Sequence, residues 1–331
     1  MTAMPKSSLA GRCFSDAVLA HAIVLGNRHG ILDRIADGSI VIDGACDQSM
    51  ASKSHIVEAV VRTLWATDAA EVNKENGRVT LTDFGKELYQ EREVFALWLD
   101  AYSNLLAYWL QPDATTPSDL GSIIKGNVVA TSSAAIGSRY LDQDVLSLFR
   151  DLKPQGTLCD IGCGNARRLF RLCKEFHLKG IGIDISPGAL QAAEPIIAEA
   201  KDEGIDLRVE IGDATRIRGS YPDVIIVMQT FMTHHITSDN FCESVLRTYP
   251  KIFPSAEYFV FFDTTTSEDK PEAQLFSPGF DYIHRLQDLR PRTRSALLSV
   301  FDEAQFDLIK EVNLRVPNSY AWVLKPRGPR G

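Results

Sequence analysis

The chain has 331 residues, of which 45% are hydrophobic and 24% are charged, and its formal net charge is -8. This length predicts two domains, and the acidic balance argues against a nucleic-acid partner, which usually needs a basic face. No apolar run approaches the roughly 20 residues that span a bilayer, and the first residues lack the pattern of a secretory leader. We therefore expect a cytoplasmic protein with no membrane span. The six cysteines show neither zinc spacing nor the density of a disulfide scaffold, so we expect them to be reduced and mostly buried.

Residues 1–140 have mainly helical apolar spacing, as in FSDAVLAHAIVLG and HIVEAVVRTLWATDAA. The exception is a stretch in which Asn76-Gly77 separates two short strand-like runs, as is typical of a tight hairpin. A helix, a hairpin and a second helix predict a winged-helix unit. Because no basic recognition helix accompanies it, we expect this domain to serve dimerisation and to cover the substrate, and we expect a homodimer.

Later in this half, the stretch FALWLDAYSNLLAYWLQ predicts one amphipathic helix. Its aromatic stripe contains Trp98, Tyr102, Tyr108 and Trp109. Such a stripe is either part of a core or the wall of a pocket, and in the second case Trp98 and Ser103 would lie near the mouth.

Residues 141–331 follow a different pattern, in which short apolar runs alternate with helical stretches. The runs are TLCDI, GIGIDI, LRVEIGD, DVIIVMQ and YFVFFD. This alternation predicts an α/β domain with a parallel sheet covered by helices. The last two runs, FDLIKEVNLRV and SYAWVLKP, are joined through Pro317-Asn318 and predict a terminal antiparallel pair, which makes seven strands in a Rossmann-like sheet.

The segment LCDIGCGNARRLFRL predicts a strand, a glycine turn and a helix. Gly162 and Gly164 allow the backbone to approach a ligand that a Cβ atom would block. Asp184 follows twenty residues after Gly164, at the end of the next strand, where it can accept hydrogen bonds from ribose hydroxyls. Arg167 replaces the third glycine of the dinucleotide pattern, which weakens a pyrophosphate interpretation.

Three further features accompany the glycine turn. Asp160 immediately precedes it, Asp213 follows the third strand in IGDAT, and the terminal strand pair follows the fifth strand. Together these motifs resemble those of class I S-adenosylmethionine (SAM) methyltransferases. The resemblance implies a methionine site at Asp160, Gly162 and Gly164, a ribose contact at Asp184, an adenine contact at Asp213 and Ala214, and a pocket closed by Gln229. It also implies that Ala166 stands where many members have a third glycine.

His234 and His235 follow the fourth strand, at the sheet edge where open α/β proteins bind ligands. His284 lies in YIHRLQDL, on a segment that can return over the same edge, so we expect three imidazoles to converge. Imidazole is a common metal ligand. The other interpretation makes one of them, His235 or His284, a general base.

A narrower resemblance extends over nearly the whole chain. The helical first half, the run VVATSSAAIGSRYLDQDVL, the histidine pair and YIHRLQDL are similar to the 2-oxo acid C-methyltransferases of the 2-ketoarginine and phenylpyruvate type. This implies an iron ion held by His234 and His284, with His235 as a further ligand, a base or a supporting residue. Asp263 is the nearest carboxylate for such a site. The substrate contacts implied or suggested are Trp98, Ser103, Lys125 and Arg139.

The leading hypothesis is a metal-assisted SAM-dependent enzyme of specialised metabolism that methylates the β-carbon of a 2-oxo acid through its enolate. The second hypothesis is a small-molecule O-methyltransferase with a histidine as general base. A third, from another class, is a non-catalytic winged-helix regulator.

Overall fold

The computed structural model describes residues 8–41, 54–115, 122–267 and 276–328. The chain forms two compact units, Met1–Asp100 and Ala101–Gly331. The boundary expected from the sequence, at residue 140, lies inside the second unit. Helix α7 (Gly126–Tyr140) packs on α10 (Pro187–Asp202), and this contact assigns it to the second unit.

The first unit is mostly helical. Its elements are α1 (Leu9–Arg28), α2 (Ile31–Ala36), α3 (Ser54–Ala66), β1 (Ala70–Val72), β2 (Val79–Leu81), α4 (Asp83–Gln90) and α5 (Arg92–Phe95). Strands β1 and β2 pair antiparallel, and Gly77 in their turn has a φ of 67°. The expected helix–hairpin–helix order is therefore present. Its core includes Ile23, Ile31 and Val61, each at most 1% exposed.

Helix α1 differs from the sequence expectation about membrane spans. Among the described residues it is the one helix long and apolar enough to cross a membrane. Length and composition alone are weak evidence, since Leu19 and Ile23 pack in the core of the unit. Its first half is exposed and carries an apolar residue, Phe14, that is 72% exposed.

The predicted amphipathic helix of residues 95–111 is broken. After α5 the chain makes a π-helical stretch, Ala96–Ala101, and then α6 (Ser103–Trp109). A wider turn of this kind shifts the helical face by one residue, so the aromatic side chains do not form one straight stripe. The indole Nε1–H of Trp109 donates to the carbonyl of Leu286, 2.9 Å away, which ties α6 to the end of α13.

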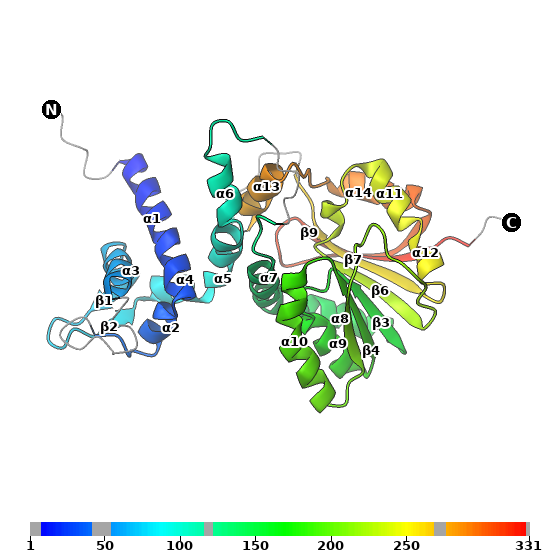
Figure 1. Cartoon of the computed structure of the whole chain (residues 1–331), viewed down its shortest axis with the longest axis horizontal. Coiled ribbons are helices and arrows are strands. Elements are labelled where there is room, and N and C mark those ends of the chain that lie inside the picture. Colours follow the sequence, from blue (N-terminus) through cyan, green and yellow to red (C-terminus); the bar gives the residue numbers. More distant parts are fainter. Residues whose placement is uncertain (1–7, 42–53, 116–121, 268–275, 329–331) are drawn as a thin grey trace. The chain divides into compact units, whose positions relative to one another are not determined.

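The second unit is a seven-stranded sheet with helices on both faces (Figure 1). Its strands are β3 (Thr157–Ile161), β4 (Lys179–Asp184), β5 (Leu207–Ile211), β6 (Val224–Thr230), β7 (Tyr258–Thr264), β8 (Phe306–Asn313) and β9 (Ser319–Pro326). Their order is β5-β4-β3-β6-β7-β9-β8, with β9 antiparallel to both β7 and β8 and the other neighbours parallel. The predicted Rossmann-like sheet and its terminal strand pair are confirmed.

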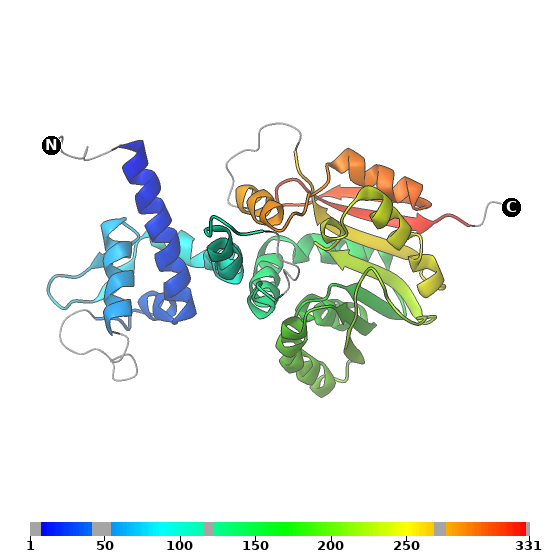
Figure 2. The same cartoon turned by 45° about the horizontal axis from the view of Figure 1, so that its top comes forward.

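Two apolar cores lie on the two faces of this sheet, and Figure 2 shows the helices that cover each. The remaining helices of the unit are α8 (Asp142–Leu152), α9 (Arg167–Phe176), α11 (Asp239–Leu246), α12 (Tyr249–Ile252), α13 (Ser277–Leu286) and α14 (Arg294–Glu303). Helices α8, α9 and α10 cover one face, and α11, α12 and α14 cover the other. Since the central strands β6 and β7 are buried on both faces, their sequences are nearly continuous apolar runs.

Candidate active site

The glycine turn follows β3 directly. Gly162 and Gly164 have φ angles of 79° and 55°, a region that favours glycine. A Cβ atom on Gly162 would lie 2.1 Å from Cγ of Met232, so any side chain there would clash. Ala166 also has a positive φ, 58°, which explains why glycine would suit its position.

Asp184 joins this turn to the end of β4. Its Oδ2 accepts a hydrogen bond from the backbone N–H of Gly164 and its Oδ1 accepts one from Ser186, each 2.9 Å long. Burial raises the pKa of Asp184, and these backbone N–H groups oppose that rise. The remaining lone pairs of the carboxylate can accept from the two ribose hydroxyls expected here.

Asp160 is 2% exposed at the end of β3. Its Oδ1 has no hydrogen-bond partner among the described residues. Burial raises the pKa of Asp160 to about 7, although the guanidinium of Arg168 opposes the rise. A buried carboxylate with an unused acceptor fits a cationic donor, such as the amino group of the methionine part of SAM.

The other expected cofactor residues lie at the same sheet edge, in different roles. Asp213 binds the N–H and hydroxyl of Thr215 through Oδ1, which leaves Oδ2 for a ligand. The amide of Gln229 is used internally, because its nitrogen donates to Tyr249 and its oxygen accepts from Thr233. The same Tyr249 hydroxyl donates to the carbonyl of Ala214. Gln229 and Ala214 are therefore linked to each other through the hydroxyl of Tyr249.

The three histidines converge as expected. His234 and His235 lie on a single turn of 3-10 helix, Thr233–His235, after β6, and His284 lies on α13. Each offers a ring nitrogen, and these atoms all lie within 4.8 Å of one another. Imidazole nitrogens bind a transition metal at about 2.0–2.1 Å, so small side-chain rotations would let them share one ion.

Hydrogen bonds at the Nδ1 atoms orient two of the rings. Nδ1 of His234 lies 2.6 Å from Oδ1 of Asp263, and Nδ1 of His284 lies 2.6 Å from the carbonyl oxygen of Phe280. A carbonyl can only accept, so His284 carries its proton on Nδ1 and leaves Nε2 as a lone-pair donor. Asp263, considered as a ligand from the sequence, instead binds the ring and the backbone N–H of His234. Ligand-orienting carboxylates of this kind are common around metal-binding histidines.

The surroundings keep the imidazoles neutral. Burial lowers the pKa of His234 to about 3, and the cation of Arg292 adds to this. Burial and the neighbouring His234 lower the pKa of His284 to about 3. Desolvation and the two adjacent rings also lower the pKa of His235, although this residue as a whole is exposed. Neutral imidazole is the form that binds metals or accepts a proton.

Sequence reasoning missed an aromatic wall beside the histidines. The ring centroids of Phe276 and Phe280 are 5.7 Å apart, those of Phe280 and His284 are 4.3 Å apart, and Phe231 lies 6.4 Å from Phe276. Phe276, Phe280 and His284 are spaced by four residues. This spacing on one helical face was a usable signal.

The four residues expected to contact the substrate do not form one cluster as the histidines do. Trp98 is buried in the first unit, whereas Ser103, Lys125 and Arg139 belong to the second. Lys125 precedes the first turn of α7, next to Gly126, which abuts Ser186 beside the cofactor turn. Arg139 lies at the far end of α7, exposed and 5.4 Å from the ring of Tyr140. At 1.5 Å per residue the two cations are about 20 Å apart along the helix, so one substrate carboxylate cannot contact both.

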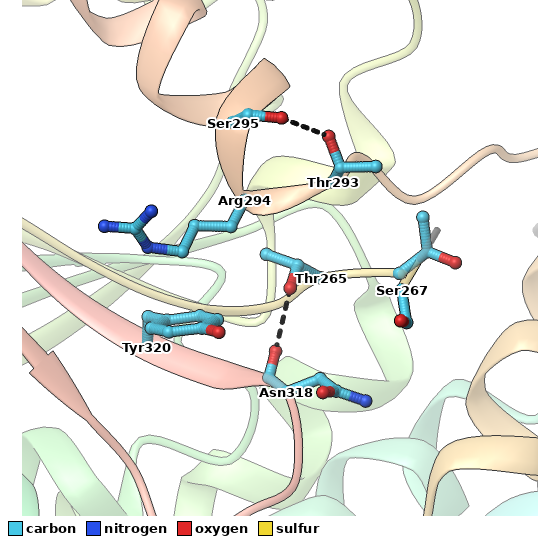
Figure 3. A pocket seen from close by; sticks show the side chains of 8 residues that line it. Thr265, Ser267, Thr293, Arg294, Ser295, Asn318 and Tyr320 are labelled. Atoms are coloured by element: carbon cyan, nitrogen blue, oxygen red, sulfur yellow. Dashed lines mark hydrogen bonds between the residues drawn. The ribbon is translucent and has the colours of Figure 1, made fainter. Parts of the chain in front are cut away.

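A separate hollow of about 310 Å³ lies between the end of β7 and the start of α14 (Figure 3). It is lined by Thr265, Thr266, Ser267, Thr293, Arg294, Ser295, Asn318 and Tyr320. Thr265 donates to the carbonyl of Asn318, and the hydroxyls of Thr293 and Ser295 bond to each other. None of the histidines or glycine-turn residues lines it, so this hollow is separate from the histidine cluster.

Comparisons with known proteins agree with this geometry. A family model described as a methyltransferase domain matches residues 152–289. The chain is 42% identical over 325 residues to an indolepyruvate C-methyltransferase of Streptomyces griseus, covering 98% of this chain and 97% of that protein. Two solved structures share the fold. The mitomycin 7-O-methyltransferase MmcR has a TM-score of 0.68 at 12% identity, over 96% of this chain and 97% of its own. Human N-acetylserotonin methyltransferase in complex with SAM has a TM-score of 0.68 at 14% identity, over 98% and 100%.

The chain therefore belongs to the class I SAM-dependent methyltransferases. It is an enzyme of this class, with SAM as its cofactor. The hypothesis of a non-catalytic regulator is set aside by this membership.

Proposed function

We propose that the enzyme methylates the β-carbon of an aromatic 2-oxo acid in specialised metabolism, with a transition metal, iron by resemblance, held by His234 and His284. The observation that carries the proposal is the convergence of imidazole nitrogens at the sheet edge that also bears the glycine turn. The likeness to an indolepyruvate C-methyltransferase supports the substrate class. A metal ion there would act as a Lewis acid toward the substrate's carboxylate and ketone and make its C3 hydrogen more acidic.

His235 is the proposed acceptor of the C3 proton. It is exposed, and its side chain makes no hydrogen bond with the described residues. Loss of this proton leaves an electron pair that forms the new bond from C3 to the methyl carbon. The sulfur–methyl bond breaks, and S-adenosylhomocysteine leaves with the former bonding pair. The remaining task of the protein is alignment of the two substrates.

Two other features support an aromatic 2-oxo acid. The wall formed by Phe231, Phe276 and Phe280 gives an aromatic side chain apolar rings to pack against. Lys125, at the cofactor end of α7, is the better placed of the two candidate cations for the substrate carboxylate, so we assign that role to it rather than to Arg139.

The test is metal analysis of untagged protein together with transfer from labelled SAM to a panel of 2-oxo acids. We expect near-stoichiometric metal, label on the β-carbon, and loss of both in His284→Ala. The control is His177→Asn, which changes an exposed histidine whose left-handed backbone suits asparagine. Full activity after exhaustive chelation would exclude the metal-assisted route.

An O-methyltransferase with His235 as general base is the second candidate. It is favoured by the exposed neutral imidazole, and the structure of an O-methyltransferase shares the fold. Methylation of a phenol panel by metal-free protein, with no transfer to any 2-oxo acid, would support it.

A further inference from the structure

The loop that carries the histidine pair has an unusual backbone. Phe231, just before it, has a φ of 53°, and Ser238, at its end, has φ 57° and ψ 146°. Residues other than glycine rarely adopt these backbone conformations. Such conformations persist only where surrounding contacts hold them. The loop of residues 233–238 therefore needs an anchor.

The side chain of Arg292 supplies that anchor. Its Nη2 donates to the carbonyls of Ile236 and Ser238, each 2.7 Å away, and its Nη1 donates to that of Thr233, 3.2 Å away. Its Nε donates to Oδ1 of Asp239, 2.6 Å away. Arg292 is only 9% exposed, so these four acceptors replace the water that a guanidinium would otherwise require.

The backbone of Arg292 is fixed as well. It lies in the short linker between α13, which carries His284, and α14. Its carbonyl accepts a hydrogen bond from the N–H of Thr266, 2.9 Å long, just beyond the strand that carries Asp263. One residue thus connects the histidine loop, the segment after His284 and the extension of β7.

We infer that Arg292 is a positioning residue, whose buried guanidinium holds the loop of His234 and His235 at the distance from His284 that lets His234 and His284 share a ligand. The inference rests on the proposed function of the histidine cluster. Arg292 itself is assigned no contact with substrate or cofactor.

Arg294 is a matched control two residues away. Its guanidinium pairs with Glu311 on β8 and lies 5.8 Å from the ring of Tyr320, beside the hollow (Figure 3). Its side chain is 47% exposed, and within the described part of the chain its guanidinium contacts Glu311 and Tyr320 instead of the histidine loop. Removing it changes the net charge by the same amount and leaves the anchor intact.

The experiment compares full-length Arg292→Ala, Arg292→Lys and Arg294→Ala in two measurements. The first is hydrogen exchange of a peptide covering residues 231–242, and the second is titration with Co²⁺ alone. For Arg292→Ala we expect about tenfold faster exchange in this peptide and unchanged exchange in the other strands. We expect Co²⁺ affinity to fall about 10–100-fold and to recover partly with millimolar guanidinium or in Arg292→Lys. Arg294→Ala should resemble the parent, and SAM affinity should be unchanged throughout.

Parent-like exchange and Co²⁺ affinity in Arg292→Ala would overturn the inference. Weaker Co²⁺ binding without any recovery would also overturn it, because it would indicate general damage. If Arg292→Ala does not fold, Arg292→Lys carries the same comparison. If the parent protein binds no Co²⁺, the proposed metal function fails, while the exchange measurement still decides the role of Arg292.

Discussion

Nδ1 of His234 lies 2.6 Å from Oδ1 of Asp263, and both side chains are buried. Asp263 also accepts hydrogen bonds from the backbone N–H groups of His234 and Thr264. In Asp263→Asn an NH2 group would replace one of the two carboxylate oxygens, so a donor would face an N–H donor. We expect metal affinity to fall about 10–100-fold, as for other ligand-supporting carboxylates. Competition with a chelating dye measures it, with the exposed Asp307→Asn as control. Equal affinity in the two variants would show that the orienting bond is dispensable.

His235→Gln separates the proton acceptor from the metal ligands. If His235 accepts the C3 proton, the variant should retain its metal and lose transfer. It should also lose the exchange of C3 hydrogen for deuterium that the parent catalyses without SAM, which proton NMR follows against an enzyme-free control. Loss of the metal instead would make His235 a third ligand. The three ring nitrogens lie within 4.8 Å of one another, so a third ligand at His235 would also fit the structure.

Asp184→Ala should weaken SAM binding, because the ribose hydroxyls lose their acceptor. The variant also loses the two backbone hydrogen bonds that fix the turn at Gly164 and Ser186. Bonds to charged groups contribute about 1.5–3 kcal/mol each, so we expect at least a tenfold loss of affinity by calorimetry. The control is Asp206→Ala, which removes an exposed partner of Lys179. Unchanged affinity would contradict the assignment of the ribose site.

Asp160→Asn should stabilise the protein without SAM at high pH. The folded-state pKa of Asp160 is raised from 3.8 to about 7, so the folded protein binds this proton more tightly than the unfolded chain. The carboxyl therefore costs stability progressively as pH rises from about 4 to 7, by at most about 4 kcal/mol. The melting temperature of the variant relative to the parent should rise between pH 5 and pH 8. Its SAM affinity should fall at both. A difference in melting temperature that does not change with pH would contradict this.

A homodimer through the first unit remains a prediction, and α1 offers a test. Phe14, Val18 and Leu25 are 72%, 39% and 36% exposed and share one helical face. A second copy of the chain would cover this apolar stripe. Light scattering should give a dimer for the parent and a monomer for Phe14→Glu with Val18→Glu. The control is the exposed Trp65→Glu on α3. A monomeric parent would exclude the dimer.

The succession of strands along the chain and the glycine turn were predictable, because local apolar runs and single glycines carry that information. The broken helix around Ala96 was not, since one extra residue in a turn leaves the apolar spacing nearly unchanged. The domain boundary depends on which neighbour α7 packs against. Packing between segments sixty residues apart leaves no local pattern.

At the site, the convergence of the histidines could be predicted. His234 and His235 follow β6, and His284 lies on a segment that can return over the same edge of the sheet. The roles of Asp263 and Arg292 could not. A carboxylate at a strand end suits a ligand or a ligand's partner equally, and only the 2.6 Å bond distinguishes them. Arg292 stands among three arginines beside a proline, a composition that is typical of a solvated linker. Its burial follows from the strained loop it contacts.

Strand β9 lies between β7 and β8, although it is the last of the seven strands in the chain. During synthesis, β7 therefore emerges with an unpaired edge and must wait for the final residues, Ser319–Pro326, to cover it. The side of β7 that pairs with β9 is therefore completed last. A chain that lacks β9 would leave β7 and β8 without the strand that pairs with both, which would favour aggregation over a partly active enzyme.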